Sequence, residues 1–229
     1  MKRQFDPGEP EMMDRPQPVS AELISDLRNL RQLNRYFGSY ALTTLFLRRW
    51  IQPGAQFRVL DLATGSGDIP RLVVDYARQV GATVTVEAID QQSSTLEIAR
   101  GLSAGYPEID FKQGDILSFG EDEQYDIVLC SLALHHFADE AAVHLLERCR
   151  QLSRKFVLVS DLRRGLLASV GVHLLTTFIY REAMTRNDAR LSAARAFSFR
   201  EFRSLAERAG WRNFQHRKFR FGRQAVWLE

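Results

Sequence analysis

The stretch FRVLDLATGSGDIP, residues 57–70, predicts a buried strand, a glycine turn and the start of a helix. The strand FRVLDL ends on an acid, Asp61, and residues 63–67 carry little side-chain bulk. A ligand can therefore lie against the backbone there, because the first N–H groups of a helix have no partner within it. Asp68 is placed to cap this helix, and Pro70 is tolerated in a first turn.

The residues that this turn lacks narrow the choice of ligand. No Lys-Ser/Thr pair follows the glycines, which excludes a phosphate-binding P-loop, and the third glycine of a dinucleotide fingerprint would fall at Pro70. Asp61 and Asp68 flank the turn and would repel a pyrophosphate. A ligand with a hydroxylated sugar and a cationic end suits the turn better, and S-adenosylmethionine fits that description.

VLDLATGSGDIP resembles motif I of the class I S-adenosylmethionine-dependent methyltransferases. Its form, D-x-A-x-G-[ST]-G-D, is most similar to the ubiquinone/menaquinone methyltransferases and their small-molecule relatives. The resemblance runs from about residue 34 to the C-terminus. It implies a Rossmann-like, seven-stranded, mostly parallel sheet with helices on both faces, a final antiparallel strand pair at the sheet edge, and S-adenosyl-L-methionine as cofactor.

Length and composition predict one globular domain with an added cap. The chain has 229 residues, is 45% hydrophobic, and carries a formal charge of +3. Much of the basic excess lies in the last third, where solvated faces are a commoner explanation than a nucleic-acid patch. Cys130 and Cys149 are expected to be buried free thiols.

The first 19 residues carry four prolines among charged residues, which predicts a flexible N-terminal arm. This arm has no apolar signal region, and no apolar run in the chain has the length of a membrane span. A reduced cytoplasmic protein is therefore expected. A helical cap over residues 20–52 and a methyltransferase domain over 53–229 are expected to follow the arm.

Strands that alternate with helices predict an α/β fold with a parallel sheet. The expected strands are 57–62, 83–90, 109–113, 125–134 and 155–162, before a hairpin of 211–218 and 223–228. The segment 163–197 interrupts this alternation and is expected to be a helical lid insertion. A buried cap helix, a dimer contact and a membrane-surface contact remain open for it. Ser198 and Glu201 predict a capping box for the helix after it.

Ligands of such sheets bind at the carboxyl ends of the strands. Polar residues follow the predicted strands at those ends: Asp61, Asp90, Asp115, Ser131, His135 and Asp161. Asp90, which ends the second strand, is a suitable acceptor for two ribose hydroxyls. The resemblance implies that Asp115 accepts the adenine amino group and that Ile116 lies against the ring. The residues expected to hold the cofactor are Asp61, Ala63, Thr64, Gly65, Ser66, Gly67, Asp68, Asp90, Gln91, Asp115, Ile116, Ser131 and Leu132.

Methyl transfer from a sulfonium requires alignment of the reacting atoms, exclusion of water and, for a hydroxyl acceptor, a base. His135 and His136 follow the fourth strand and are the catalytic candidates. Adjacent side chains point in different directions, so only one is expected to face the substrate. The substrate candidates are Tyr36, Tyr40, His136, Asp161 and His173. No His/Cys group has zinc spacing, and no metal is expected.

We therefore expect an S-adenosylmethionine-dependent methyltransferase for a small, lipophilic aromatic, polyketide or quinone-like acceptor, acting at oxygen. C-methylation of a quinol precursor is the enzyme alternative. RNA methylation and non-catalytic S-adenosylmethionine binding are the others, although the N/D-P-P-[YF] motif of amino-methylating enzymes is absent after the fourth strand. No nucleic-acid partner is expected, and homodimerisation is left open.

Overall fold

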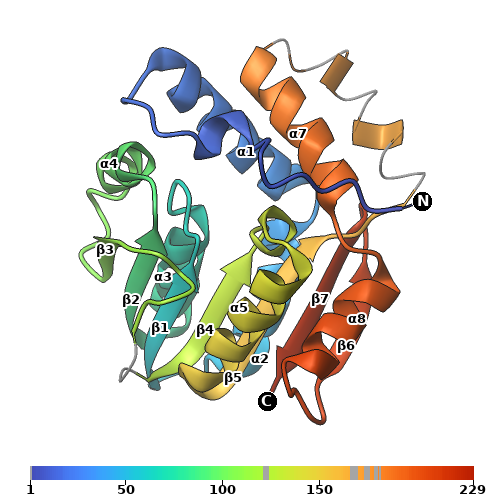
Figure 1. The fold of residues 1–229 in the computed structure, drawn as a ribbon. Coiled ribbons are helices and arrows are strands. Elements are labelled where there is room, and N and C mark those ends of the chain that lie inside the picture. Colours follow the sequence, from blue (N-terminus) through green and yellow to red (C-terminus); the bar gives the residue numbers. More distant parts are fainter. Residues whose placement is uncertain (1, 121–123, 166–169, 173–175, 178–179, 181) are drawn as a thin grey trace.

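The computed structural model describes residues 2–120, 124–165, 170–172, 176–177, 180 and 182–229. A seven-stranded sheet with the order β3-β2-β1-β4-β5-β7-β6 forms its centre (Figure 1). The first five strands are parallel, whereas β7 is antiparallel to both β5 and β6. The strands are β1 Gln56–Leu62, β2 Thr83–Asp90, β3 Ile109–Gln113, β4 Tyr125–Ser131, β5 Ser153–Leu162, β6 Gln215–Phe219 and β7 Arg223–Leu228.

Helices cover both faces of the sheet. Along β1 the side chains alternate, so that Val59 packs under α2 and α3, while Leu60 and Leu62 pack under α5 and α8. Two further helices, α1 and α7, lie across the edge where the parallel strands end (Figure 1). The helices are α1 Ala21–Tyr36, α2 Ser39–Trp50, α3 Asp68–Val80, α4 Ser93–Leu102, α5 Asp139–Gln151, α7 Ala183–Arg195 and α8 Phe199–Arg208, with short 3-10 helices η1 Met12–Asp14 and η2 Leu134–His136.

The predicted α/β fold with a mostly parallel sheet is confirmed, and several boundaries differ from the predictions. The strand expected to run to residue 134 ends at Ser131, because Leu132 takes a left-handed φ of 59°. Asp68 does not cap α3: Gly67 is the N-cap residue, and the Asp68 carboxylate bonds Asn34 and Tyr40 instead. The capping box of Ser198 and Glu201 is present.

Within the segment 163–197, the structure describes a helix, α7, over Ala183–Arg195. Part of the apolar block between residues 165 and 180 lies outside the described residues, and so does His173. Among the described residues, no helix has both the length and the apolar character that a membrane crossing requires.

Residues 2–19, where the sequence predicts a flexible arm, pack over the sheet edge between α7 and η2 (Figure 1). The Arg3 guanidinium donates to the Phe137 carbonyl at 2.7 Å and forms an ion pair with Asp139 at 3.0 Å. The backbone N–H groups of Met12 and Met13 donate to the Asp188 carboxylate of α7. The arm is therefore bonded to the same two elements that border the carboxyl end of β4.

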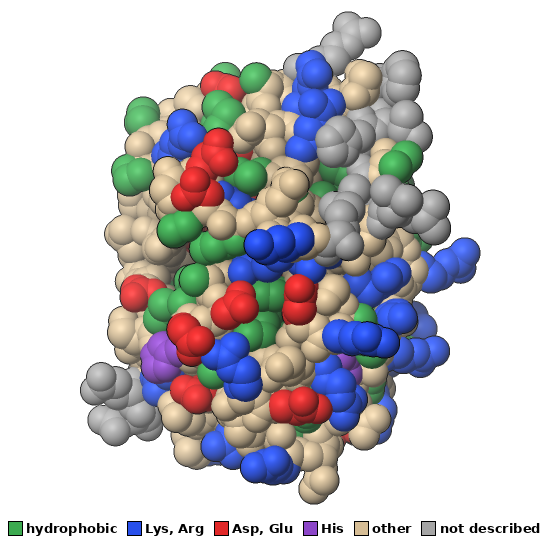
Figure 2. Space-filling view, turned by 45° about the vertical axis from the view of Figure 1, so that its right-hand side comes forward, with side chains coloured by type: hydrophobic (Ala, Val, Ile, Leu, Met, Phe, Trp, Pro, Cys, Tyr) green, Lys and Arg blue, Asp and Glu red, His purple; other side chains and the backbone are tan. Residues whose placement is uncertain are grey.

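Basic and acidic side chains are mixed on the C-terminal surface. Figure 2 shows Lys and Arg side chains concentrated toward one side of the molecule, with acidic side chains beside them. On α8, Arg203 pairs with Glu207 at 2.9 Å and Arg208 pairs with Glu140. The face around α8 is therefore of mixed charge rather than uniformly basic.

A buried carboxylate joins α1 to α7. Asp26 is fully buried, and its Oδ1 accepts a hydrogen bond from the Thr185 hydroxyl at 2.6 Å. Asn29, one turn further along α1, donates to both Thr185 and Glu182. Burial raises the pKa of Asp26 to about 7. The folded protein therefore binds a proton at Asp26 that the unfolded chain releases near pH 4.

The replacement Asp26→Asn should change how stability depends on pH. Because the pKa is raised on folding, the stabilising contribution of Asp26 is complete below about pH 4 and is lost as the pH rises through 7. Relative to wild type, Asp26→Asn should gain roughly 2–3 kcal/mol in unfolding free energy between pH 5 and pH 8, measured by urea denaturation. Glu22→Gln, an exposed position on α1, is the control; an equal gain there would contradict the assignment.

Candidate active site

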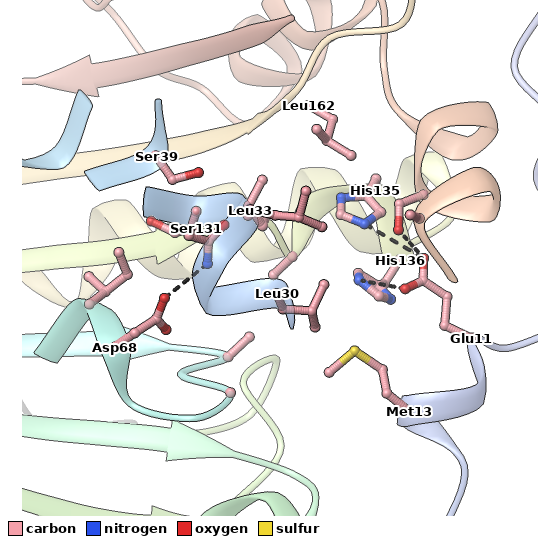
Figure 3. A pocket seen from close by; sticks show the side chains of 18 of the residues that line it. Glu11, Met13, Leu30, Leu33, Ser39, Asp68, Ser131, His135, His136 and Leu162 are labelled. Atoms are coloured by element: carbon pink, nitrogen blue, oxygen red, sulfur yellow. Dashed lines mark hydrogen bonds and ion pairs between the residues drawn. The ribbon is translucent and has the colours of Figure 1, made fainter. Parts of the chain in front are cut away.

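A cavity of about 770 Å³ lies at the carboxyl ends of β1, β2 and β4, beneath α1, α7 and the N-terminal arm (Figure 3). The structure brings most of the predicted site residues to its wall. Those lining it are Asp61, Ala63, Thr64, Gly65, Ser66, Asp68, Asp90, Gln91, Asp115, Ile116, Ser131, Leu132, His135 and His136.

The glycine turn is held to the end of β2. The backbone N–H of Gly65 donates to Asp90 Oδ2 at 2.8 Å, and that of Gln92 donates to Asp90 Oδ1 at 3.0 Å. Gly65 has a φ of 54°, and no atom lies within 4 Å of the Cβ that a side chain would add. A ligand can therefore approach the backbone at Gly65, with the Asp90 carboxylate beside it. Each oxygen of that carboxylate keeps a free lone pair.

Two more acids flank the turn in different environments. Asp61 is buried, and this burial, together with the nearby charges of Asp68 and Asp90, raises its pKa to about 8. Asp68 Oδ2 accepts hydrogen bonds from Asn34 and from the Tyr40 hydroxyl, both at 2.9 Å. A cation bound between these acids would favour the charged form of Asp61.

Strained backbone gathers around the cavity. Ala63, Leu132 and Phe221 have φ values between 55° and 59°, and all three line the cavity wall. Left-handed conformations in non-glycine residues cost about 1–3 kcal/mol and cluster at functional sites. At Leu132 the conformation is held by the bond from its N–H to the Ser160 carbonyl at 2.8 Å.

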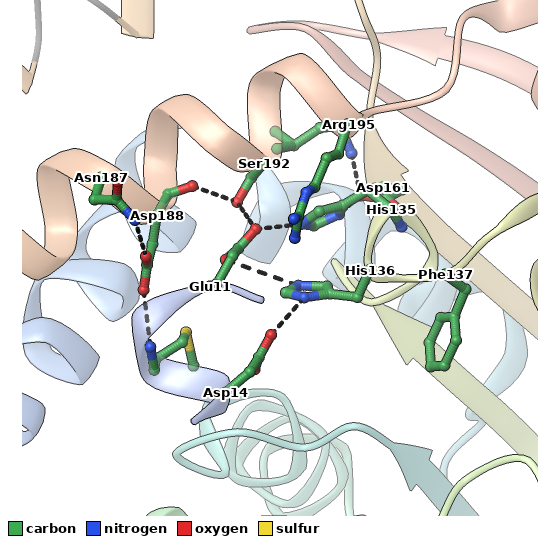
Figure 4. Close-up of polar contacts among 12 residues, drawn as sticks. Glu11, Asp14, His135, His136, Phe137, Asp161, Asn187, Asp188, Ser192 and Arg195 are labelled. Atoms are coloured by element: carbon green, nitrogen blue, oxygen red, sulfur yellow. Dashed lines mark hydrogen bonds and ion pairs between the residues drawn. The ribbon is translucent and has the colours of Figure 1, made fainter. Parts of the chain in front are cut away.

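The two adjacent histidines of η2 are each held by a carboxylate (Figure 4). His135 Nδ1 contacts Asp161 Oδ1 at 2.7 Å, and the His135 backbone N–H donates to Asp161 Oδ2 at 2.8 Å. His136 Nδ1 contacts Asp14 Oδ2 at 2.7 Å. The Nε2 atoms of both rings face Glu11, at 3.7 Å from Oε1 for His135 and 4.0 Å from Oε2 for His136.

The charges of this group depend on one another. Burial alone would lower the pKa of His136, but the carboxylates of Glu11 and Asp14 raise it to about 10. Burial raises the pKa of Glu11. At Asp161, contact with His135 outweighs burial and lowers the pKa. His136 is therefore an imidazolium at neutral pH, which suits a hydrogen-bond donor better than the expected base.

The far side of the cavity is apolar. Its aliphatic and aromatic side chains come from the arm, from α1, from the end of β5 and from the lid segment. They are Met13, Leu27, Leu30, Leu33, Phe37, Leu162, Val172, Ala189, Ala193 and Phe221. The cavity thus has a polar end at the glycine turn and an apolar end under α1 and α7.

Some predicted residues lie elsewhere. Tyr36 is 68% exposed and does not line the cavity, and Tyr40 contacts Asp68 from outside the lining. Gly67 packs against Phe111 rather than lining the cavity. Asp161 lies behind His135 and supports it.

Other wall residues are missing from the prediction. Glu11, Met13 and Asp14 come from the arm, where no periodic pattern or motif marks them. Asn34 could have been found, because it is a polar residue within the apolar pattern of α1.

Comparison with known proteins agrees with this geometry. A family model described as a methyltransferase domain matches residues 59–155. An uncharacterized methyltransferase of Bacillus subtilis, YcgJ, is 31% identical over 108 residues, which cover 46% of this chain and 41% of that protein. A 2-phytyl-1,4-naphtoquinone methyltransferase of Thermosynechococcus vestitus is 39% identical over 69 residues, 30% of this chain and 29% of that protein. The chain spans less than half the length of both relatives.

Solved structures share the fold. Human N-acetylserotonin methyltransferase, in complex with S-adenosylmethionine, superposes with a TM-score of 0.62 at 19% identity, over 89% of this chain and 54% of that one. A methyltransferase from Aquifex aeolicus gives 0.62 at 16% identity, over 89% and 96%. The domain match and the fold place this chain in the class I S-adenosylmethionine-dependent methyltransferases, as the glycine-turn motif predicts.

Gly67 and Gly81 provide a matched test of the packing of the turn. Both have a φ of 72°, but an added Cβ would lie 2.8 Å from the Phe111 ring at Gly67 and would meet nothing within 4 Å at Gly81. Gly81→Ala should cost about 1 kcal/mol of unfolding free energy, the strain of the left-handed conformation alone. Gly67→Ala should cost roughly 1–3 kcal/mol more because of overpacking. Equal losses in urea denaturation would contradict the observed contact.

Proposed function

We propose that this protein transfers the methyl group of S-adenosylmethionine to an oxygen of a small, apolar acceptor. The observation that carries the proposal is the two-ended cavity. The open glycine turn and Asp90 lie at its polar end, and the side chains of α1, α7 and the arm form its apolar end. A volume of about 770 Å³ lies in the upper part of the range of ligand pockets, which suits a cofactor together with a small acceptor.

The residues at the polar end suit the proposed cofactor. The Asp90 carboxylate offers free lone pairs to the ribose hydroxyls, and Gly65 leaves room for close approach to the backbone. The buried Ser39 hydroxyl lines the cavity and has no hydrogen-bond partner among the described residues, so it can bond a polar ligand atom. Asp61 and Asp68 favour a cationic group. When bound, the cofactor supplies a methyl group already activated by its sulfonium charge.

The chain itself aligns the acceptor and excludes water. The apolar side chains of α1 and α7 hold the acceptor's hydrocarbon part, and the arm covers the opening beside η2. Glu11, His135 and His136 form the polar patch next to this apolar end, so they face the reacting oxygen of the acceptor. In-line alignment of this kind can supply much of a rate enhancement by itself.

Relatives support a small-molecule acceptor of this kind. Besides the phytyl-naphtoquinone enzyme, the chain is 32% identical over 107 residues to a ubiquinone biosynthesis O-methyltransferase of Pasteurella multocida, over 42% of this chain and 41% of that protein. Both names refer to quinones. The polar patch beside an apolar chamber favours a hydroxylated ring over a fully apolar one.

Calorimetric titration tests the cofactor. S-adenosylmethionine should bind the wild-type chain, while NAD and ATP should not. Asp90→Asn should weaken binding roughly 10- to 100-fold, because it removes a charge that strengthens the hydrogen bonds from the ribose. Asp110→Asn, an exposed acid on β3, should leave the affinity unchanged. Binding of NAD or ATP in place of S-adenosylmethionine would overturn the proposed function.

A panel of phenols and quinols tests the acceptor, with NMR to locate the new methyl group. Methyl ethers should form, and Leu30→Ala should raise KM for the acceptor roughly tenfold without weakening the cofactor, because it removes apolar contact at one end only. Leu102→Ala on the α4 surface is the control. A methyl group on ring carbon would establish the C-methylation alternative, and turnover of RNA alone would reject a small acceptor.

A further inference from the structure

The side chains of Glu11, His135 and His136 converge on one point of the cavity wall (Figure 4). One coordinating atom from each lies within 4.8 Å of the corresponding atoms of the other two. Glu11 and His135 are buried, and 22% of the His136 side chain is exposed. Two imidazoles and a carboxylate thus meet beside the cavity, and the carboxylate is contributed by the arm.

The partners of the histidines determine which ring atoms are available. Asp161 and Asp14 each contact an Nδ1 atom at 2.7 Å, and an ionised carboxylate only accepts hydrogen bonds. Both Nδ1 atoms therefore carry the hydrogen, and in a neutral ring the lone pair lies on Nε2. These are the atoms that face Glu11. Carboxylates that hold Nδ1 in this way are the usual outer partners of metal-binding histidines.

The separations suit a shared cation better than direct bonds. Nε2 of His135 and of His136 lie 3.7 and 4.0 Å from the Glu11 oxygens, beyond the 2.7–3.2 Å of an N–H···O hydrogen bond. A tetrahedral ion with bonds of about 2.0–2.1 Å holds its ligand atoms about 3.3 Å apart. Each pair would close by less than about 1 Å around such an ion. Ser192, which donates to Glu11 Oε1 at 2.7 Å, already orients the carboxylate.

We propose that Glu11, His135 and His136 form a binding site for one divalent transition-metal ion. Two imidazole nitrogens and one carboxylate suit Zn²⁺, Co²⁺, Mn²⁺ or Fe²⁺, whereas Mg²⁺ prefers oxygen ligands alone. Three protein ligands leave at least one coordination position open, and the site borders the cavity. The ion would also tie the N-terminal arm to the loop after β4.

A consequence for catalysis rests on the proposed function. An acceptor hydroxyl at the open position would lose its proton more readily, because a bound cation stabilises the alkoxide or phenolate. That would provide the activation for which a base was expected at His135 or His136. The metal site itself does not require methyl transfer.

The test uses the full chain, stripped of metal with a chelator and then dialysed. Calorimetry with Zn²⁺ and absorption spectroscopy with Co²⁺ should each show one equivalent bound, with visible Co²⁺ bands stronger than those of the aqueous ion. Glu11→Gln and His136→Gln should each weaken binding at least tenfold. Asp14→Asn, which removes only the partner of His136 Nδ1, should weaken it about 10- to 100-fold.

His144→Gln is the matched control, because His144 lies on the α5 surface with a side chain that is 52% exposed. It should bind Co²⁺ as wild type does. No uptake by wild type, or uptake that survives Glu11→Gln, would overturn the metal site and leave an ion-pair cluster. S-adenosylmethionine titration of the same preparations checks that each variant folds. Loss of cofactor binding in wild type with intact metal binding would instead overturn the proposed function alone.

Discussion

The backbone of the turn between β1 and α3 is the constraint on which the rest of the site depends. Gly65 and Gly67 both adopt left-handed conformations, and the Gly65 N–H bonds Asp90 at the end of β2. Because parallel strands end at one edge of the sheet, this turn also brings Asp61 and Ser131 to the same cavity. The polar end of the site therefore depends on backbone geometry first and on side chains second.

The roof over this cavity is assembled differently. It comes from α1, α7 and the arm, which are held mainly by polar contacts, such as those of Asp26 with Thr185 and of Asp188 with the start of η1. The apolar cluster under these elements is small, with Leu23, Leu27 and Met184 at its centre. Elements with few buried apolar contacts open at lower free energy than core strands. The roof is thus the part of the structure best suited to open for an acceptor.

The strands and the turn could be predicted because their signals are local. The strand at 83–90 was predicted with its observed ends, since an apolar run closes on an acid at Asp90. The prediction of β4 was wrong at its end, because the run CSLAL stays apolar while Leu132 turns left-handed. The capping role of Asp68 was wrong as well, since Asn34 and Tyr40 hold its carboxylate.

The sequence alone determined the α/β sheet, the glycine turn and the acid at the end of β2, because short-range periodicity and the conformational freedom of glycine specify them. Only the tertiary structure decided that Glu11 and Asp14 face the two histidines, and that Asp161 lies behind one of them. No spacing in the chain encodes that meeting. It depends on how the arm and α7 pack over the sheet edge, and such packing arises from contacts between residues far apart in the sequence.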